Sequence, residues 1–166
     1  MTIETYKNKK IIGRAEWITL QGLHMPPLLA RIDSGAKTSS LHAYEITEYD
    51  HKGELWVKFK TRPKTIDTHS VIQCKAKVIT KKMIKSSNGE RQCRYVIETE
   101  SRMGGEVRGV QFTLSNRKKM RFRVLIGRRT IGAFNFLVDV QKRTVLEDYS
   151  KHSPSHKNQT NQSNKQ

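Results

Sequence analysis

The chain has 166 residues, of which 35% are hydrophobic, and it carries 32 lysines and arginines against 15 aspartates and glutamates. The formal net charge of +17 favours a polyanionic partner, such as nucleic acid, an anionic membrane surface or an acidic peptide. Two cysteines are too few for a disulfide framework. No signal peptide is recognisable and no apolar run approaches the roughly 20 residues that cross a bilayer, so we expect a cytoplasmic protein with no membrane partner.

The end of the chain differs in composition from the rest. After Tyr149 the sequence has no aliphatic or aromatic residue, so this segment cannot bury enough apolar surface to offset its ordering entropy. We therefore predict one domain over residues 1–148 and a disordered polar tail over residues 149–166. The 16 residues after Ser150 hold three lysines and no acid, which leaves 29 bases and 15 acids, a charge of +14, for the domain itself.

Short apolar runs between turn residues predict strands along the whole domain. In chain order, the predicted elements are strands at 10–20 (with Gly13 as a bulge), 28–33, 39–47, 54–61, 69–79, 93–100, 107–116 and 120–127, a helical turn at 128–134, and a strand at 136–140. Asn88-Gly89 is typical of a hairpin turn. Many short strands without a βαβ alternation predict a mainly β fold with little helix, either a small barrel or a sandwich.

Residues 30–43, ARIDSGAKTSSLHA, place an acid, a hydroxyl residue and a glycine directly after an apolar strand. These residue types are common in turns, and a plain turn is one interpretation. Aspartic peptidases need the same types, because a carboxylate must end a strand and small residues must let two loops approach each other. Two carboxylates about 3 Å apart share one proton, so that one acts as a general base on water and the other donates to the substrate carbonyl.

Several sequence blocks resemble those of one bacterial family. They are Gly13-Arg14-x-Glu16-Trp17, DSGAKTSSLHA at 33–43, SSNG at 86–89 with VIET at 96–99, MRF at 120–122, IGR at 126–128 and FLVD at 136–139. In this order they are similar to the RimB-like family of retropepsin-like aspartic peptidases. That family also carries the name ATP-dependent zinc protease and is associated with ATP-grasp glutamate ligases of the RimK type.

The resemblance implies a small closed β-barrel of the retropepsin type, with Asp33 as the catalytic acid on a loop built by Ser34 and Gly35. It also implies a peptidase that trims poly-glutamate from a protein modified by the ligase, and the basic domain suits that acidic substrate. None of the other aspartates stands in an Asp-Ser/Thr-Gly context. The second carboxylate is therefore expected from Asp33 of another subunit in a homodimer.

The zinc and ATP of that family name have no counterpart among the motifs of this sequence. It has no H-E-x-x-H and no Gly-rich phosphate loop, and the only histidines at ligand spacing, His152 and His156, lie in the predicted tail. We therefore expect neither a metal site nor a cofactor. His42, at the end of the motif, is expected to be a hydrogen-bonded strand residue rather than one that tunes the active-site loop or binds substrate.

Four bases are candidates for binding an acidic substrate. Lys37 lies four residues after the candidate catalytic aspartate. In retropepsins the arginine that follows the glycine commonly has a structural role. That arginine corresponds to Arg128 here, which leaves the next residue, Arg129, as the candidate for binding substrate. Arg91 and Arg94 flank the predicted hairpin, which we expect to border the cleft as a flap. Each of these bases also has a simpler interpretation as a solvated surface charge.

Two other functions fit the composition. A small basic β-barrel also suits binding to nucleic acid or the ribosome, in which case the DSG motif is only a turn. Against that function, the aromatic residues are sparse and form no stripe on which bases could stack. The second alternative is a retropepsin-like fold that has lost activity and serves as an adaptor.

Overall fold

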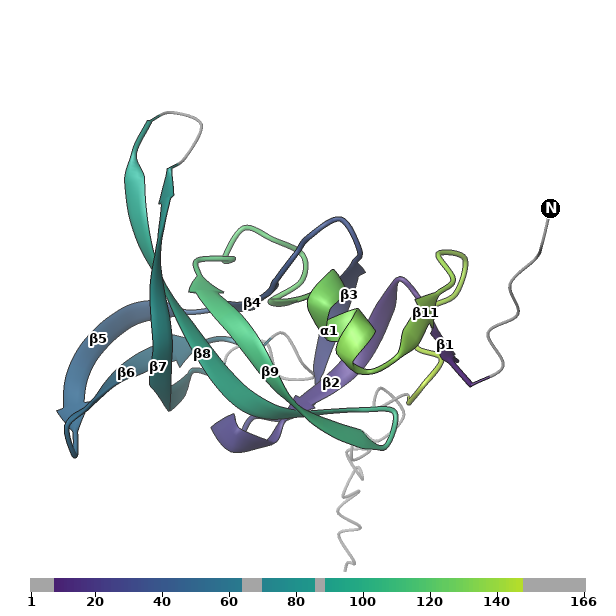
Figure 1. The fold of residues 1–166 in the computed structure, drawn as a ribbon, viewed down its shortest axis with the longest axis horizontal. Coiled ribbons are helices and arrows are strands. Elements are labelled where there is room, and N and C mark those ends of the chain that lie inside the picture. The colour runs from purple at the N-terminus through teal and green to yellow at the C-terminus, as the bar shows by residue number, and fades with distance from the viewer. Residues whose placement is uncertain (1–7, 64–69, 86–88, 148–166) are drawn as a thin grey trace, which may run out of the picture.

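The structure, a computed structural model, describes residues 8–63, 70–85 and 89–147. Strands dominate it, as predicted, and one short helix packs near the end of the domain (Figure 1). The strands and helices are β1 (Lys10–Ile12), β2 (Ala15–Leu20), the 3-10 turn η1 (Gln21–Leu23), β3 (Leu28–Asp33), β4 (Ser39–His42), β5 (Tyr44–His51), β6 (Glu54–Thr61), β7 (Ile72–Lys85), β8 (Arg91–Met103), β9 (Glu106–Ser115), β10 (Val124–Gly127), α1 (Arg128–Ala133) and β11 (Phe136–Val138).

One sheet contains nine of the strands, in the order β2-β3-β10-β4-β9-β8-β7-β6-β5. A further pairing, which sets Thr19 opposite Arg102 and Leu20 opposite Ser101, joins β2 to β8. It closes β2, β3, β10, β4, β9 and β8 into a ring, while β7, β6 and β5 continue outward from it (Figure 1). The mainly β, retropepsin-like fold expected from the sequence is therefore confirmed, with this ring as its closed part.

Alternation of side chains along β3 and β10 separates the core from an outer face. Leu28, Ala30 and Ile32 on β3 are buried in the core. Val124 and Ile126 on β10 are fully buried beside them. Because successive side chains of a strand point to opposite faces, the remaining β3 side chains, which end with Asp33, lie on the outer face.

The strand predicted over residues 10–20 is interrupted at Gly13 and Arg14. The interruption is not the predicted bulge, since β1 pairs with β11 and β2 pairs with β3 in a different sheet. A Cβ atom on Gly13 would lie 2.4 Å from the carbonyl oxygen of Lys142. The Arg14 amide donates to that same oxygen at 2.8 Å. Glycine is therefore needed here because the C-terminal segment crosses the chain at this point.

Glu16 fastens the same C-terminal segment. Its side chain is fully buried, and Oε1 accepts hydrogen bonds from the amides of Gly13 (2.8 Å) and Val145 (2.9 Å). Its Oε2 accepts a third bond, from the amide of Leu146, at 3.2 Å. The block Gly13-Arg14-x-Glu16 thus joins β2 to residues 142–146, which is a structural role.

The strand predicted over residues 120–127 begins only with β10. Residues 116–123 form a loop instead, here called the basic loop. Arg117 Nε donates to the Phe122 carbonyl oxygen at 3.2 Å, and Arg123 Nη1 donates to the Arg117 carbonyl oxygen at 2.6 Å. These bonds turn the loop back on itself in place of a strand ladder.

Two further predictions concern residues outside the described ranges, namely the hairpin turn at Asn88 and the polar tail. The domain boundary at residue 148 therefore stays a prediction.

Across the described ranges, no helix combines the length and the apolar character that crossing a bilayer requires.

Candidate active site

Asp33 is the last residue of β3, and its side chain is half-buried on the outer face. Its Oδ1 accepts hydrogen bonds from the amides of Gly35 at 3.1 Å and Ala36 at 3.2 Å. These bonds fix the orientation of the carboxylate relative to its own loop. Among the residues that the structure describes, none donates to Oδ2, so this oxygen is not engaged by the described part of the chain.

Residues 34–38, here called the Asp33 loop, connect β3 to β4, and Gly127 allows this loop to pack tightly on β10. This strand runs parallel to β3 and sets Gly127 beside Asp33. A Cβ atom on Gly127 would lie 2.6 Å from the carbonyl group of Thr38 and 2.9 Å from the carbonyl oxygen of Ala36. The Gly127 amide donates to Ser39 Oγ at 3.1 Å, and this hydroxyl is 2.7 Å from Thr130 Oγ1. The Asp33 loop and β10 therefore lie at a distance that only glycine permits at position 127.

Arg128, at the start of α1, holds the other side of the loop. Its amide donates to the Ala36 carbonyl oxygen at 2.8 Å. Its Nη1 donates to the Gly35 carbonyl oxygen at 3.0 Å. The guanidinium therefore acts on the backbone of the Asp-Ser-Gly motif, which agrees with the structural role expected for this arginine.

A cavity of about 420 Å³ lies beside the Asp33 loop. We call it the cationic cavity, because three of its lining residues are Lys82, Arg94 and Arg117 and none is an acid. The other lining residues are Ala36, Thr38, Ser40, Gln92, Thr113, Ser115, Asn116, Met120 and Leu125. Three cations with neighbouring hydroxyl and amide groups suit one or more carboxylates.

Arg117 was not singled out by sequence reasoning, although it lies in the densest basic run. Burial and the neighbouring Arg31 lower its pKa, and Asp33 acts in the opposite direction. The guanidinium therefore lies within electrostatic reach of both the candidate catalytic carboxylate and a second arginine. Sequence spacing gives no sign of this, because 84 residues separate Arg117 from Asp33.

Comparison with known families identifies the chain. Residues 11–148 match the family described as RimB-like, retropepsin-like aspartic endopeptidase RimB. The chain belongs to the RimB-like family. A solved structure from Legionella pneumophila, of a protein of unknown function (DUF785), is also similar, with a TM-score of 0.71 and 30% identity over 83% of this chain and 98% of that one.

Curated relatives of this RimB-like chain are named probable alpha-L-glutamate ligases. The protein from Desulfotalea psychrophila is 41% identical over 145 residues, which cover 87% of this chain and 31% of the relative. The protein from Shewanella pealeana is 43% identical over 125 residues, 75% of this chain and 27% of the relative. The RimB-like chain therefore spans less than a third of the length of these relatives.

The structure separates the four bases predicted to bind substrate. Arg94 lines the cationic cavity, and Arg91 is exposed nearer the hairpin tip without lining it. Lys37 is exposed on the Asp33 loop, where its carbonyl oxygen accepts the Arg129 amide at 3.3 Å. The Arg129 side chain lines a different cavity of about 220 Å³, which Glu98 also lines. Hairpin β7–β8 thus borders the cationic cavity through Arg94 and Lys82, and its role as a flap over substrate stays a prediction.

His42 supports the basic loop of this RimB-like chain. Its ring is buried, and Nδ1 accepts the Arg117 amide at 2.9 Å. Burial and the charge of Arg123 lower the pKa of His42 to about 4, so the ring is neutral near pH 7. The expectation of a hydrogen-bonded strand histidine is confirmed.

No group of three or more His, Cys, Asp or Glu that could hold a metal occurs within the described ranges.

Proposed function

We propose that this chain is an aspartic endopeptidase that hydrolyses peptide bonds in an acidic, poly-glutamate segment of a cytoplasmic protein. The observation that carries the proposal is the geometry of the Asp33 loop. One carboxylate oxygen is tied to the amides of Gly35 and Ala36, and the loop packs against Gly127 without an intervening side chain. A fixed carboxylate on a small-residue loop is what a shared aspartate pair requires.

The second carboxylate comes from Asp33 of a second copy of the chain. The sequence contains one Asp-Ser-Gly motif, and two loops of this kind meet at a two-fold axis only if no bulky side chain separates them. The pair holds one proton between two carboxylates. The ionised carboxylate takes a proton from water, whose oxygen attacks the peptide carbonyl carbon, while the protonated carboxylate donates to the carbonyl oxygen. Collapse of this intermediate breaks the C–N bond, and the amine leaves with a proton.

Charge supports an acidic substrate. The cationic cavity next to the Asp33 loop is lined by Lys82, Arg94 and Arg117 and by no acid, within a chain of net charge +17. Relatives named probable alpha-L-glutamate ligases contain a region similar to this chain. A peptidase region joined to a ligase that adds glutamate is consistent with removal of the glutamates added. We therefore infer a functional link to an ATP-grasp glutamate ligase.

The decisive experiment compares wild type with Asp33→Asn on a peptide that ends in several glutamates and on the same peptide with glutamines. Wild type is expected to cleave the glutamate peptide, and the variant is expected to lose at least about a thousandfold in kcat/KM, because the amide cannot activate water. Mass spectrometry of the products locates the cleaved bond. Cleavage that persists in Asp33→Asn contradicts the aspartic mechanism.

The two alternative functions predict other outcomes of this experiment. A nucleic-acid-binding protein cleaves neither peptide and binds RNA with a steep salt dependence. An inactive adaptor cleaves neither peptide and binds the glutamate peptide equally well in wild type and Asp33→Asn. Thermal unfolding of both proteins serves as the control that the substitution leaves the fold intact.

A further inference from the structure

The outer face of β3 carries side chains in a row that ends at Asp33. Leu29, Arg31 and Asp33 alternate with the buried positions of this strand. In the parallel register with β10, Arg31 lies beside Leu125 and Asp33 lies beside Gly127. Leu125 lines the cationic cavity, so Arg31 lies next to that cavity on the same face. Leu29 is the next outer-face residue away from Asp33.

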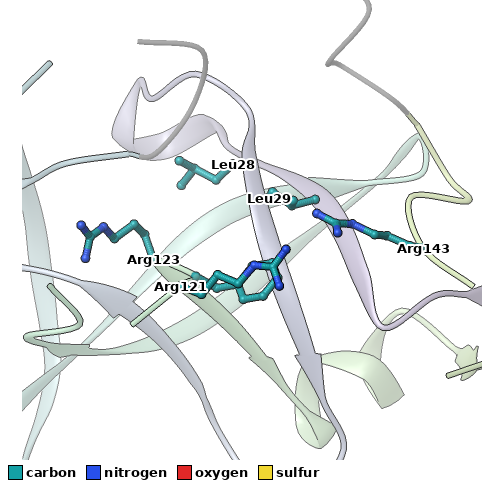
Figure 2. A pocket seen from close by; sticks show the side chains of 6 residues that line it. Leu28, Leu29, Arg121, Arg123 and Arg143 are labelled. Atoms are coloured by element: carbon teal, nitrogen blue, oxygen red, sulfur yellow. The ribbon is translucent and has the colours of Figure 1, made fainter. Parts of the chain in front are cut away.

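A second cavity, of about 240 Å³, lies at Leu29. We call it the distal cavity, and its lining residues are Leu28, Leu29, Arg121, Phe122, Arg123 and Arg143. Figure 2 shows that Arg143 approaches from the C-terminal segment on one side of Leu29, while Arg123 lies on the other side. Arg121 lies over the Phe122 ring, 5.6 Å from its centroid. The cavity thus combines an apolar floor with three guanidinium groups.

These three guanidinium groups lack acidic partners among the described residues. No ion pair joins Arg121, Arg123 or Arg143 to any carboxylate of the described ranges. Arg123 is only 9% exposed, and its buried Nε has no hydrogen-bond partner within the same ranges. A desolvated cation whose charge is not balanced by an acid is costly in the free protein. An anionic ligand in the distal cavity would balance that charge.

The basic loop connects the two cavities. Its residues Arg117 and Met120 line the cationic cavity, and its residues Arg121 to Arg123 line the distal cavity. Arg31, exposed on β3, lies in the row between Leu29 and Asp33. Cationic side chains are therefore available along the whole outer face from the Asp33 loop to the distal cavity.

We propose that the distal cavity binds a carboxylate side chain of the acidic substrate, about four residues from the bond that Asp33 cleaves. This inference rests on the proposed function. Leu29 and Asp33 are four strand residues apart, which corresponds to about 13 Å, and an extended peptide covers this length with about the same number of residues. Because every residue of a poly-glutamate chain carries a carboxylate, one of them reaches the arginines in any register.

The test uses Arg121→Gln/Arg143→Gln, which removes two exposed cations of the distal cavity. The matched control is Lys118→Gln/Lys119→Gln, which removes the same charge from exposed residues of the basic loop that line neither cavity. Both are assayed on a short peptide of about three glutamates and a long one of about ten. The arginine variant is expected to lose about tenfold in kcat/KM on the long peptide and less than about twofold on the short one.

The proposal is wrong if the arginine variant loses the same factor on both peptides, or no more than the lysine control. Binding of a labelled long oligoglutamate to Asp33→Asn protein separates this result from the proposed function. One outcome is that wild type cleaves neither peptide, while Arg121→Gln/Arg143→Gln weakens this binding about tenfold and the lysine control does not weaken it. In that case the subsite stands and the peptidase function fails. A larger loss for a short RNA than for oligoglutamate contradicts a carboxylate subsite.

Discussion

Two carboxylates of this chain, Asp33 and Glu16, accept hydrogen bonds from backbone amides but differ in how many of their oxygens are engaged. Glu16 is fully buried, and both of its oxygens accept amides of the crossing chain segments. Asp33 is half-buried, and only Oδ1 is held, by the amides of its own loop. A carboxylate with both oxygens engaged stabilises the fold, whereas one with a free oxygen can act on water.

Glu16→Ala is expected to reduce the free energy of unfolding by about 3–5 kcal/mol, because three backbone amides lose their acceptor, one of them in a buried hydrogen bond. Glu16→Gln is expected to cost less, since its amide oxygen still accepts from one or two of them. Urea unfolding followed by fluorescence measures both. The control is Glu100→Ala on β8, where the side chain is exposed and the change should remain within about 0.5 kcal/mol. Equal effects at both sites would contradict the anchoring role of Glu16.

His42 gives the fold a predictable pH dependence. Its pKa is about 4 in the folded chain against an ordinary 6.5, because the ring is buried and lies near Arg123, Arg117 and Arg62. Between these values the unfolded chain binds a proton that the folded chain does not bind, so stability falls as the pH decreases from about 6.5 to 4.

His42→Asn is expected to remove about 2 kcal/mol of this loss, since Asn Oδ1 accepts the Arg117 amide without titrating. The measurement is urea unfolding of wild type and variant at pH 7.5 and pH 4.5. His51→Asn, at an exposed position, serves as the control and should leave the pH dependence unchanged. A wild-type pH dependence that persists in His42→Asn would show that other groups cause it.

At the scale of elements, the sequence pattern correctly predicted those strands and turns that are determined by residues within the segment itself. The strand at 28–33 and the helical turn after Gly127 were predicted, because alternation and glycine punctuation lie within the segment itself. The break at Gly13 was read as a bulge, because its cause is the crossing of Lys142, far along the sequence. Residues 120–123 of the basic loop were predicted as the start of a strand, because apolar and basic residues alternate there as they would on an edge strand.

The residues of the candidate site likewise fall into those that a local motif predicts and those that only the fold brings together. The Asp-Ser-Gly motif was recognisable because its residues are adjacent in the sequence. Arg117 and Lys82 join the cationic cavity only through the pairing of β7, β8 and β9, which composition does not encode. The net charge favours an acidic partner, but it does not indicate which side chains line a cavity beside Asp33.

Hairpin β7–β8 offers a matched pair of arginines for testing its role at the cleft. Arg94 lines the cationic cavity, whereas Arg91 is exposed on the same strand and does not line it. Arg94→Gln is expected to raise KM for a glutamate peptide by about tenfold, because a charge-assisted hydrogen bond to the substrate is lost. Arg91→Gln should change it by less than about twofold. Steady-state kinetics on glutamate and glutamine peptides measures both, and equal effects on the two peptides would speak against substrate binding by this hairpin.

At the scale of the whole molecule, the charge and the single motif act together. A net charge of +17 favours an acidic chain as partner, and within the described ranges Asp33, the cationic cavity and the distal cavity all adjoin the outer face of β3. Two copies that join their Asp33 loops would bring two such faces to one cleft. The acidic substrate would then meet cations on both sides of the bond to be cleaved.

Mixing of subunits tests whether the site is shared. A constant amount of wild type is equilibrated with increasing Asp33→Asn chain, and the cleavage rate of a glutamate peptide is measured. A mixed dimer holds one catalytic carboxylate instead of two and is inactive, so a ninefold excess of the variant should lower the rate to about one tenth. A doubly substituted Asp33→Asn/Gly127→Val chain provides the control, because the valine side chain would collide with the Thr38 carbonyl and displace the loop that must meet its copy. If the activity stays constant in both mixtures, each chain works alone and the shared-carboxylate mechanism is wrong.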